Sequence, residues 1–541
     1  MTPIEPTDQA ASATIRLCDV IIAGGGLAGL GLAKQLKTAN PALAIVIVEK
    51  QAFPRPLAIA KVGESTVEIG SHYLAQHLGL RQHLKDRHLK KFGIRIFFGA
   101  AVDDFSAQDE LGASQSFGIP TYQIDRGDIE NYLARELQAL GVTLIDNARI
   151  VQLELGEGIQ PAHNKKLLVR TPAGEQIICG HWLVDTAGRA SLLKNHLQLA
   201  AKNEHKSNAV WFRVERNIKL DDWSENAAWQ ARCRPEGRRW LSTNHLVGPG
   251  YWVWIIPLAS GVTSIGIVLD DTAFAAAAIQ DKTSAMAWLA QHQARLANAI
   301  GDARFLDFVG LTDYSYDCKQ VFSDQGWAIA GEAGFFADPF YSPGSDFIAF
   351  ANSFICSLII AERSGQDIRV QALVYEKLLR SIYQNTLSLY TGQYGGFGDR
   401  VMMGLKLLWD YSYYWGVLSL LYFRNALCEF ERIRPLAGEL QKAQQLNQSI
   451  QALFRARAER RLQLPNRGVF MDQYQIPCLQ FFNRVLMEEP ALPLHDELAR
   501  NMALVGQVAE AVRDMLGDSP ALAISEAERE LLGDYRLQVL G

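Results

Sequence analysis

The chain has 541 residues and a formal net charge of −5, and its 48% hydrophobic and 21% charged residues are typical of an ordinary globular protein. The length predicts two or three domains, or one large domain with a cap. The acidic balance argues against nucleic acid as a partner. Seven scattered cysteines without a CxxC pair argue against a disulfide framework and a bound metal, and for a reducing, cytoplasmic location.

The N-terminal part of the chain predicts a βαβ unit. Residues 1–16 are polar and rich in Ala and Thr, which predicts a short disordered lead and no signal peptide. The segment DVIIAGGGLAGLGLAKQL then runs from a buried strand into a helix, and LAIVIVEK adds a second strand.

The turn of this βαβ unit carries a GxGxxG spacing, formed by Gly24, Gly26 and Gly29, and Glu49 follows twenty residues later. In such a turn the glycines allow the bend, the close approach of a pyrophosphate and tight packing of helix on strand. The helix N-terminus stabilises the phosphate charge, and the acidic residue accepts hydrogen bonds from ribose hydroxyls. The sequence therefore predicts a dinucleotide site.

The next elements lead to a strand-rich middle. KFGIRIFFGA alternates, which predicts a strand with Phe92 on its apolar face and Lys91 on the other. Strand patterns then dominate from Ala209 to Val268 and end in a hairpin with GPG and ASG turns. Its strand carries Trp252 and Trp254 on one face, where they either pack a core or form the wall of a cavity.

The remainder is predicted to be helical as far as Gly541. We expect an α/β nucleotide-binding module over residues 17–365, interrupted by a sheet at about 90–125 and 205–325, and a helical C-terminal cap over 366–541. The segment Val401–Phe423 is long enough to span a membrane, but Lys406 and central aromatic residues favour a buried helix. Its aromatic residues either pack between helices or line a substrate pocket; they are Trp409, Tyr411, Tyr413, Tyr414, Trp415 and Tyr422.

Four motifs in the expected order resemble those of FAD monooxygenases and their relatives. After the GxGxxG turn come Arg126 in YQIDRGDIENYL, the DTAGR of Asp185–Arg189, and WAIAGEAGFFADPF. In the last of these Glu332 replaces the usual Asp. The resemblance implies FAD as the cofactor and a fold like that of p-hydroxybenzoate hydroxylase, with a Rossmann-type domain and an inserted substrate sheet.

Three further features resemble the flavin-dependent halogenases: GEST at Gly63–Thr66, WVWIIP at Trp252–Pro257, and Lys91. The resemblance covers about residues 17 to 360, and the tail is loosely similar to that of phenol-type halogenases. It implies catalytic roles for Lys91, Trp252 and Trp254 and a halide site at Ser342 and Gly344. The cofactor contacts that it implies are Gly24, Gly26, Leu27, Ala28, Gly29, Glu49, Lys50, Arg55, Gly63, Glu64, Ser65, Arg126, Gly331, Glu332, Asp338 and Gly344.

In the resembled family, reduced flavin from a separate reductase reacts with oxygen and oxidises halide to hypohalous acid. This acid passes through a tunnel to the lysine, while the tryptophan pair discourages ordinary monooxygenation. A buried lysine suits this role, because burial lowers its pKa. The alternative for Lys91 is a solvated lysine at the start of a strand, which the adjacent Lys90 makes plausible.

The chain also departs from the family. Tryptophan halogenases carry Glu-Ser-Thr-Gly where this chain has Tyr341-Ser342-Pro343-Gly344, so the acidic residue is absent and Pro343 has no N–H for the halide. Two functions remain open. One is halogenation of an electron-rich phenol, resorcinol or pyrrole, with a bulky or carrier-bound substrate as an option; the other is a non-halogenating monooxygenase or flavin dehydrogenase or reductase.

Overall fold

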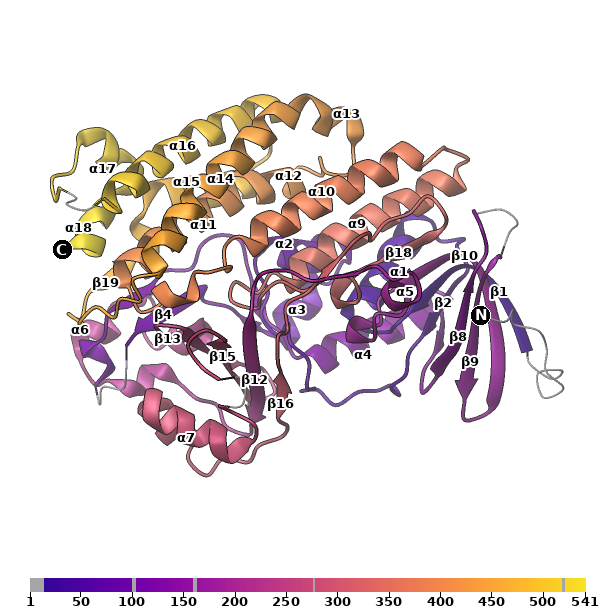
Figure 1. Ribbon diagram of the computed structural model, residues 1–541, viewed down its shortest axis with the longest axis horizontal. Coiled ribbons are helices and arrows are strands. Elements are labelled where there is room, and N and C mark those ends of the chain that lie inside the picture. The colour runs from indigo at the N-terminus through magenta and orange to yellow at the C-terminus, as the bar shows by residue number, and fades with distance from the viewer. Residues whose placement is uncertain (1–13, 100–103, 159–162, 276–277, 518–520) are drawn as a thin grey trace.

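The computed structural model describes residues 14–99, 104–158, 163–275, 278–517 and 521–541 (Figure 1). Residues 1–13 of the lead predicted over residues 1–16 lie outside the described ranges. Its last three residues already belong to strand β1, Thr14–Ala23, so the ordered chain begins earlier than the composition predicted.

The nucleotide-binding sheet is centred on β1, which pairs in parallel with both of its neighbours. The sheet order is β7-β2-β1-β10-β9-β8, and β18 also pairs with β10. Its other strands are β2 (Ile45–Val48), β7 (Thr143–Ile145), β8 (Arg149–Leu155), β9 (Lys165–Thr171), β10 (Gly174–Asp185) and β18 (Trp327–Ile329). Helix α1, Leu27–Ala39, packs against α4, Arg126–Ala139, and α9, Gly344–Arg363. The predicted α/β architecture is confirmed.

The second sheet has eight strands in the order β16-β12-β15-β14-β13-β4-β5-β19. Seven come from the predicted insertion: β4 (Ile94–Phe98), β5 (Glu110–Gly112), β12 (Ser207–Val214), β13 (Thr243–Gly248), β14 (Tyr251–Pro257), β15 (Thr263–Asp270) and β16 (Val309–Leu311). The eighth, β19 at Phe470–Asp472, comes from the tail and pairs in parallel with β5. The tail therefore adds an edge strand to this sheet, which its helical pattern did not predict.

Alternation along β14 separates two cores. Trp252 and Trp254 face the main core of the protein, whereas Val253 and Ile255 face a smaller core. Helices α7, Lys282–His292, and α8, Ala294–Ile300, supply residues to that smaller core. Because both faces of the sheet are covered, even the middle strands have no solvated face.

The segment KFGIRIFFGA, predicted to be one strand, is divided in the structure. The two-residue strand β3, Leu89–Lys90, pairs with β6, Tyr122–Gln123, and β4 begins only at Ile94. Gly93, with φ of 80°, breaks the extended conformation between the two strands. The inference that alternation places Lys91 opposite an apolar face is therefore wrong, and all five residues of β4 are buried.

The helical tail covers the upper side of both sheets in Figure 1 and shares the main core with the nucleotide-binding module. Its principal helices are α10 (Arg369–Leu387), α11 (Arg400–Tyr413), α12 (Leu420–Phe423), α14 (Ala437–Ala458), α15 (Pro477–Met487) and α16 (Leu494–Met515). A π-helical turn at Tyr414–Ser419 joins α11 to α12.

One helix within the described ranges is long and apolar enough to cross a membrane. It is α9, Gly344–Arg363, with a mean hydropathy of 1.6, and 72% of its apolar window is buried inside the protein. It packs against α1, α2 (Glu68–His72) and α10, as a core helix does. The segment Val401–Phe423 is likewise almost wholly buried among the tail helices.

Candidate active site

The glycine-rich turn opens a large cavity of about 650 Å³ between the two sheets. A Cβ at Gly24 would lie 2.5 Å from the Thr186 carbonyl oxygen, and one at Gly29 would lie 2.1 Å from that of Gly24. A Cβ at Gly26 would instead point into space, with only the Lys61 Nζ within 4 Å, at 3.8 Å. Gly24 and Gly29 therefore secure the turn, while Gly26 leaves room for a ligand at the start of α1. Leu27 and Ala28 also line this cavity.

Glu49 stands at the end of β2 with its carboxylate at the cavity wall. Its Oε2 accepts a hydrogen bond from the Gly25 N–H at 2.7 Å, and Oε1 accepts one from Gln51 at 2.8 Å. The exposed Lys50 lines the cavity beside it. Arg55, predicted to contact the cofactor, instead lies buried behind Glu49, 3.2 Å from its Oε2. Arg55 thus holds the Glu49 carboxylate in place and does not itself line the cavity.

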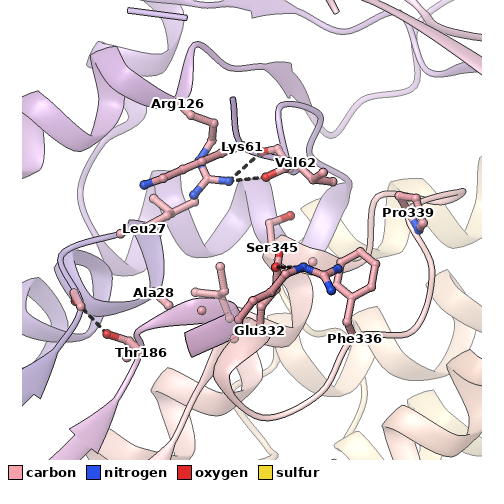
Figure 2. A pocket seen from close by; sticks show the side chains of 18 of the residues that line it. Leu27, Ala28, Lys61, Val62, Arg126, Thr186, Glu332, Phe336, Pro339 and Ser345 are labelled. Carbon is pink, nitrogen blue, oxygen red and sulfur yellow. Dashed lines mark hydrogen bonds and ion pairs between the residues drawn. The ribbon is translucent and has the colours of Figure 1, made fainter. Parts of the chain in front are cut away.

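Three cations surround one buried carboxylate on the side of the cavity near α4. Arg126, the first residue of α4, donates to the Val62 carbonyl at 2.7 Å and to Glu130 at 2.9 Å (Figure 2). Lys61 Nζ lies 2.8 Å from Glu130, which also pairs with Arg55. Burial alone raises the pKa of Glu130, but these three cations outweigh it and hold the pKa below its usual value.

This cluster tests whether a dinucleotide fits. The three cations Arg55, Lys61 and Arg126 pair with two carboxylates, Glu49 and Glu130, so this cluster keeps one net positive charge. It adjoins the start of α1, because the Lys61 Nζ would lie 3.8 Å from a Cβ at Gly26. A diphosphate is the ligand that such a charge balance and such a helix terminus favour. The residues present therefore fit FAD. Sequence reasoning found Arg126 but missed Lys61 and Glu130, although Glu130 stands four residues after Arg126 on the same helix.

The GEST segment forms the floor of the cavity. Gly63, with φ of 91°, precedes Glu64, whose carboxylate accepts a hydrogen bond from Arg213 at 2.8 Å. Burial raises the pKa of Glu64 despite this partner. Ser65 Oγ contacts Thr243 Oγ1 at 2.8 Å and so joins this loop to the second sheet.

The distal motif borders the cavity beside the start of α1, where a Cβ at Gly331 would lie 3.3 Å from the Ala28 Cβ. Gly331 lines it with φ of 61°, and Glu332 lies 3.5 Å from Arg189 of the DTAGR segment (Figure 2). Asp338 also borders the cavity, but its Oδ2 accepts hydrogen bonds from Tyr314 and Tyr394 and contacts His205 at 2.7 Å. With a fully buried side chain, Asp338 anchors the loop that follows it.

The loop predicted to bind halide through Ser342 and Gly344 has a different arrangement in the structure. Ser342 has φ of 57° and uses its N–H to donate to the Pro339 carbonyl at 2.9 Å, so this N–H does not serve an anion. Pro343 caps the N-terminus of α9, and Gly344 and Ser345 are its first two residues. Both line the cavity, and Ser345 Oγ is buried there without a hydrogen-bond partner among the described residues.

The tryptophan pair forms one wall of the large cavity and is also part of the core. Trp252 and Trp254 are 1% and 4% exposed, and their ring centroids lie 5.6 Å apart. Trp254 Nε1 donates to Ser264 Oγ at 3.3 Å, and Trp252 packs edge-on against Phe340 at 5.0 Å and beside His245 at 5.5 Å. The two tryptophans therefore do both things that the sequence left open: they pack in the core, and they form the wall of a cavity.

Lys91 lies at the junction between the lining of the large cavity and that of a second, smaller one, and it is itself part of neither lining. Its partner Ser65 borders the large cavity, and Glu68 and Asp346, whose charges act on it, border the smaller one. The inner cavity, of about 70 Å³, is bordered by Glu68, Tyr341, Asp346, Asp410, Tyr411 and Tyr414, and it shares Pro343 and Phe347 with the large cavity. Lys91 is 4% exposed, and its Nζ donates to Ser65 Oγ at 2.9 Å and to the Thr66 carbonyl at 3.0 Å. The reading of Lys91 as a solvated lysine is therefore wrong.

Burial governs the titration of the groups around Lys91. It lowers the pKa of Lys91 to about 8, against the opposing charges of Glu68 and Asp346. Burial, assisted by the charge of Lys91, lowers the pKa of His245 to about 3, so His245 is neutral at physiological pH. Lys91 is therefore the ammonium ion of this junction.

The aromatic residues of the tail divide between the two predicted roles. Tyr411, Tyr413 and Tyr414 line the inner cavity. Trp409 and Trp415 are core residues, and Trp409 Nε1 donates to Asn447 at 2.9 Å. Packing and cavity lining thus come from one helical segment.

One cluster outside the cavities has the residue types of a metal site, although the cysteine pattern predicted none. Ligand atoms of His83, His88 and Asp128 lie within 4.8 Å of one another. His88 Nδ1, however, accepts a hydrogen bond from the Asp125 N–H at 3.3 Å. In neutral imidazole this leaves the proton on Nε2, the atom that would have to bind the metal. The donor set therefore does not fit a metal.

Comparison with known proteins agrees with this geometry. Residues 17–269 match the family described as FAD binding domain. Over 430 residues the chain is 25% identical to flavin-dependent halogenase chlA of Dictyostelium discoideum, covering 74% of this chain and 70% of that protein. It is also 25% identical over 399 residues to the 1H-pyrrole-2-carbonyl-[peptidyl-carrier protein] chlorinase of Pseudomonas fluorescens, covering 70% and 83%.

In sequence, the chain is similar to flavin-dependent halogenases. Among solved structures, halogenase PltM in complex with phloroglucinol and FAD aligns with a TM-score of 0.63 at 17% identity, over 93% of this chain and 97% of that one. A flavoprotein/dehydrogenase from Cytophaga hutchinsonii aligns with a TM-score of 0.58 at 19% identity, over 72% and 88%. The chain therefore shares its fold with these flavoenzymes, and the PltM alignment includes its helical tail.

Proposed function

We propose that this chain is an FAD-dependent halogenase that uses reduced FAD, O₂ and chloride or bromide to halogenate an electron-rich aromatic compound. The position of Lys91 carries the proposal. Its ammonium ion is buried between Ser65, in the wall of the large cavity that fits FAD, and the carboxylates Glu68 and Asp346, in the wall of the inner cavity. A desolvated cation behind the wall of the flavin cavity suits the relay of a small oxidant toward the inner cavity better than a reaction completed beside the flavin.

Bound reduced FAD would activate O₂ and so oxidise the halide to hypohalous acid. The chain shows a single GxGxxG turn, so we assign reduction of the flavin to a separate reductase. Trp252 and Trp254, with Phe340 packed against Trp252, form an apolar wall that limits water beside the flavin site. Lys91 can donate its remaining proton to the hypohalous acid, because Ser65 and Thr66 occupy the other two.

The proposed halide site lies one residue further along the chain than the sequence comparison predicts. Pro343 provides no N–H, but Gly344 and Ser345 expose the first N–H groups of the twenty-residue helix α9 to the large cavity. Together with the helix terminus, these two N–H groups form an anion site that keeps Gly344 of the predicted pair and uses Ser345 in place of Ser342.

The substrate is best described as a single aromatic ring. The inner cavity has about 70 Å³, whereas an apolar cavity that holds benzene has about 150 Å³. Even one ring therefore requires its walls to move, and a bulky or carrier-bound substrate requires more. The π-helical turn at Tyr414–Ser419 borders this cavity, and such turns are frequent at functional sites.

A non-halogenating monooxygenase or dehydrogenase is the second candidate, favoured by Tyr341 and Pro343 at positions where tryptophan halogenases have Glu and Thr. The seven cysteines are free, six of them buried, which supports the cytoplasm as the location of either enzyme.

The test of function supplies the purified chain with FAD, a flavin reductase, NADH, bromide or chloride, and resorcinol. Halogenated resorcinol by mass spectrometry supports the halogenase. Hydroxylated product with both halides present, or rapid NADPH oxidation by the chain without reductase, contradicts it.

A further inference from the structure

The inner cavity has an anionic side that faces Lys91. Glu68 opens helix α2, and Asp346 lies in the first turn of α9. Both line the inner cavity, and the charges of both act on Lys91. We propose that Glu68 and Asp346 are the proton acceptors for a hydroxylated aromatic substrate held opposite Lys91. This inference rests on the proposed halogenase function and assigns further catalytic residues to it.

Asp346 is held in one orientation by two donors from different elements. Its Oδ1 accepts a hydrogen bond from the Gly70 N–H at 2.7 Å, and its Oδ2 accepts one from the Tyr414 hydroxyl at 2.7 Å. A carboxylate accepts up to about four hydrogen bonds, so two positions remain for a ligand. These anchors, from α2 and the π-helical turn, fix the orientation of the carboxylate at the edge of the inner cavity.

Of the three carboxylates that line the inner cavity, Asp410 is already neutralised. Lys406 lies 2.9 Å from its Oδ2, Tyr341 donates to the same oxygen, and Gln451 donates to Oδ1 at 2.7 Å. Glu68 and Asp346 have instead the charge of Lys91 in common. The two carboxylates that face the reactive ammonium ion are therefore the candidates for proton transfer.

The titration of this cluster supports the same assignment. Burial raises the pKa of Asp346 to about 7, with the charge of Glu68 acting in the same direction and Lys91 and Tyr414 opposing it. Burial also raises the pKa of Glu68. With a pKa of about 7, Asp346 is partly ionised at neutral pH, and its ionised form has the basicity that a general base requires.

The proton acceptors and Lys91 complete a balanced substitution with hypohalous acid as the oxidant. A substrate hydroxyl transfers its proton to the carboxylate pair, which raises electron density on the ring. A ring carbon attacks the halogen, so the carbon–halogen bond forms and the oxygen–halogen bond breaks. The departing hydroxide takes a proton from Lys91 and leaves as water. The proton lost from the ring carbon restores the phenol hydroxyl, and the proton on the carboxylate returns to Lys91.

The experiment compares resorcinol with 1,3-dimethoxybenzene, which has the same ring but no hydroxyl proton. The quantity measured is the rate of halogenation of resorcinol divided by that of 1,3-dimethoxybenzene. For the wild-type enzyme this ratio is expected to be at least ten times the ratio for free hypobromous acid in solution. D346N and E68Q are expected to reduce this preference at least tenfold, because turnover of resorcinol loses its proton acceptor and turnover of 1,3-dimethoxybenzene, which has no hydroxyl proton, falls far less. D346N should also flatten the acidic limb of the pH–rate profile, which a packing defect does not do.

Asn at position 346 can still accept from Gly70 and donate to Tyr414, so the fold is expected to persist, as FAD binding and far-UV circular dichroism will report. E376Q is the matched control, because Glu376 is a carboxylate that accepts backbone N–H groups from Val321 and Phe322 away from the cavities. Undiminished resorcinol preference in both variants, or equal losses on both arenes, would overturn the proposal. Absence of halogenated product from wild type with either arene would instead refute the halogenase function.

Discussion

The Tyr341 hydroxyl donates a hydrogen bond to Asp410 Oδ2 at 2.9 Å and so joins the loop of the flavin module to helix α11 of the tail. Tyr341 occupies the position where tryptophan halogenases carry a catalytic Glu. Asp410 is also paired with Lys406, which is fully buried. The tail thus supplies the partner that makes a tyrosine suitable at this position, and the substitution is part of how the two parts of the chain are connected.

Y341F should destabilise the protein by about 1.5–3 kcal/mol, the cost of losing one hydrogen bond to a charged group. Y341E should cost more, because a second carboxylate beside Asp410 would share the single ammonium ion of Lys406. Thermal unfolding midpoints of the two variants check both expectations. A Y341E variant that is as stable as wild type would contradict this account of the Tyr341–Asp410 pair.

Gly26→Val should abolish FAD binding and leave the fold intact. The added side chain has open space at Gly26, where only Lys61 Nζ approaches within 4 Å, so it fills the position of the ligand and displaces no neighbour. Flavin fluorescence titration measures the loss, and circular dichroism reports the fold. Gly438→Ala is the control, since a Cβ there meets nothing within 4 Å on helix α14. Undiminished FAD affinity in Gly26→Val would remove the cofactor assignment.

The sequence predicted the parts of the site that depend on local chain geometry. Gly24 and Gly26 were found because the turn between strand and helix fixes their direction, and Arg126 was found because its segment resembles a motif of FAD monooxygenases. Lys61, Glu130 and the Glu68–Asp346 pair were missed because each depends on segments far apart in the chain meeting in a low-dielectric interior. Hydrophobic periodicity does not report such meetings, since a buried charge and a solvated one interrupt the pattern in the same way.

The same limit explains the tail. Residues Phe470–Asp472 are too few to show a strand period, and their pairing with β5 is set by the sheet edge that they meet. Lys91 is a different case. A motif indicated its role, whereas the strand alternation that was used to place it was wrong. Gly93, with its positive φ, broke that alternation.

Lys91→Ala should eliminate halogenated product while FAD binding and reoxidation of reduced flavin by O₂ remain. Lys91 lies beyond the large cavity wall, bonded to Ser65 and Thr66, so its loss affects only steps after oxidation of the halide. Lys91→Arg should fail as well, because a guanidinium does not fit the same two acceptors and does not deprotonate. Stopped-flow absorbance follows the flavin, and mass spectrometry follows the product. Retained halogenation by Lys91→Ala would refute the relay.

The free energy of unfolding should depend on Asp346 between about pH 4 and pH 7. The pKa of Asp346 is raised from 3.8 to about 7 in the folded protein. Over this interval the folded state binds a proton that the unfolded state has lost, so stability falls as pH rises, by up to about 4 kcal/mol. Asp346→Asn removes this term. The melting temperature of the variant relative to wild type should therefore increase from pH 5 to pH 8, and a constant difference would contradict the raised pKa.

Removal of the tail should leave an aggregation-prone flavin module. Residues 1–365 would lose β19, which exposes the edge of β5, and would uncover the face of α9 that packs against α10 in the main core. They would also lose Asp410 and Tyr414, the partners of Tyr341 and Asp346. Exposed apolar surface of this extent associates in water, and an unpaired strand edge adds a second route to aggregation. Size-exclusion chromatography and dye binding should show oligomers where the full chain, purified in parallel, shows none. A monomeric truncation that binds FAD and halogenates resorcinol at the full rate would show that the tail forms no part of the site.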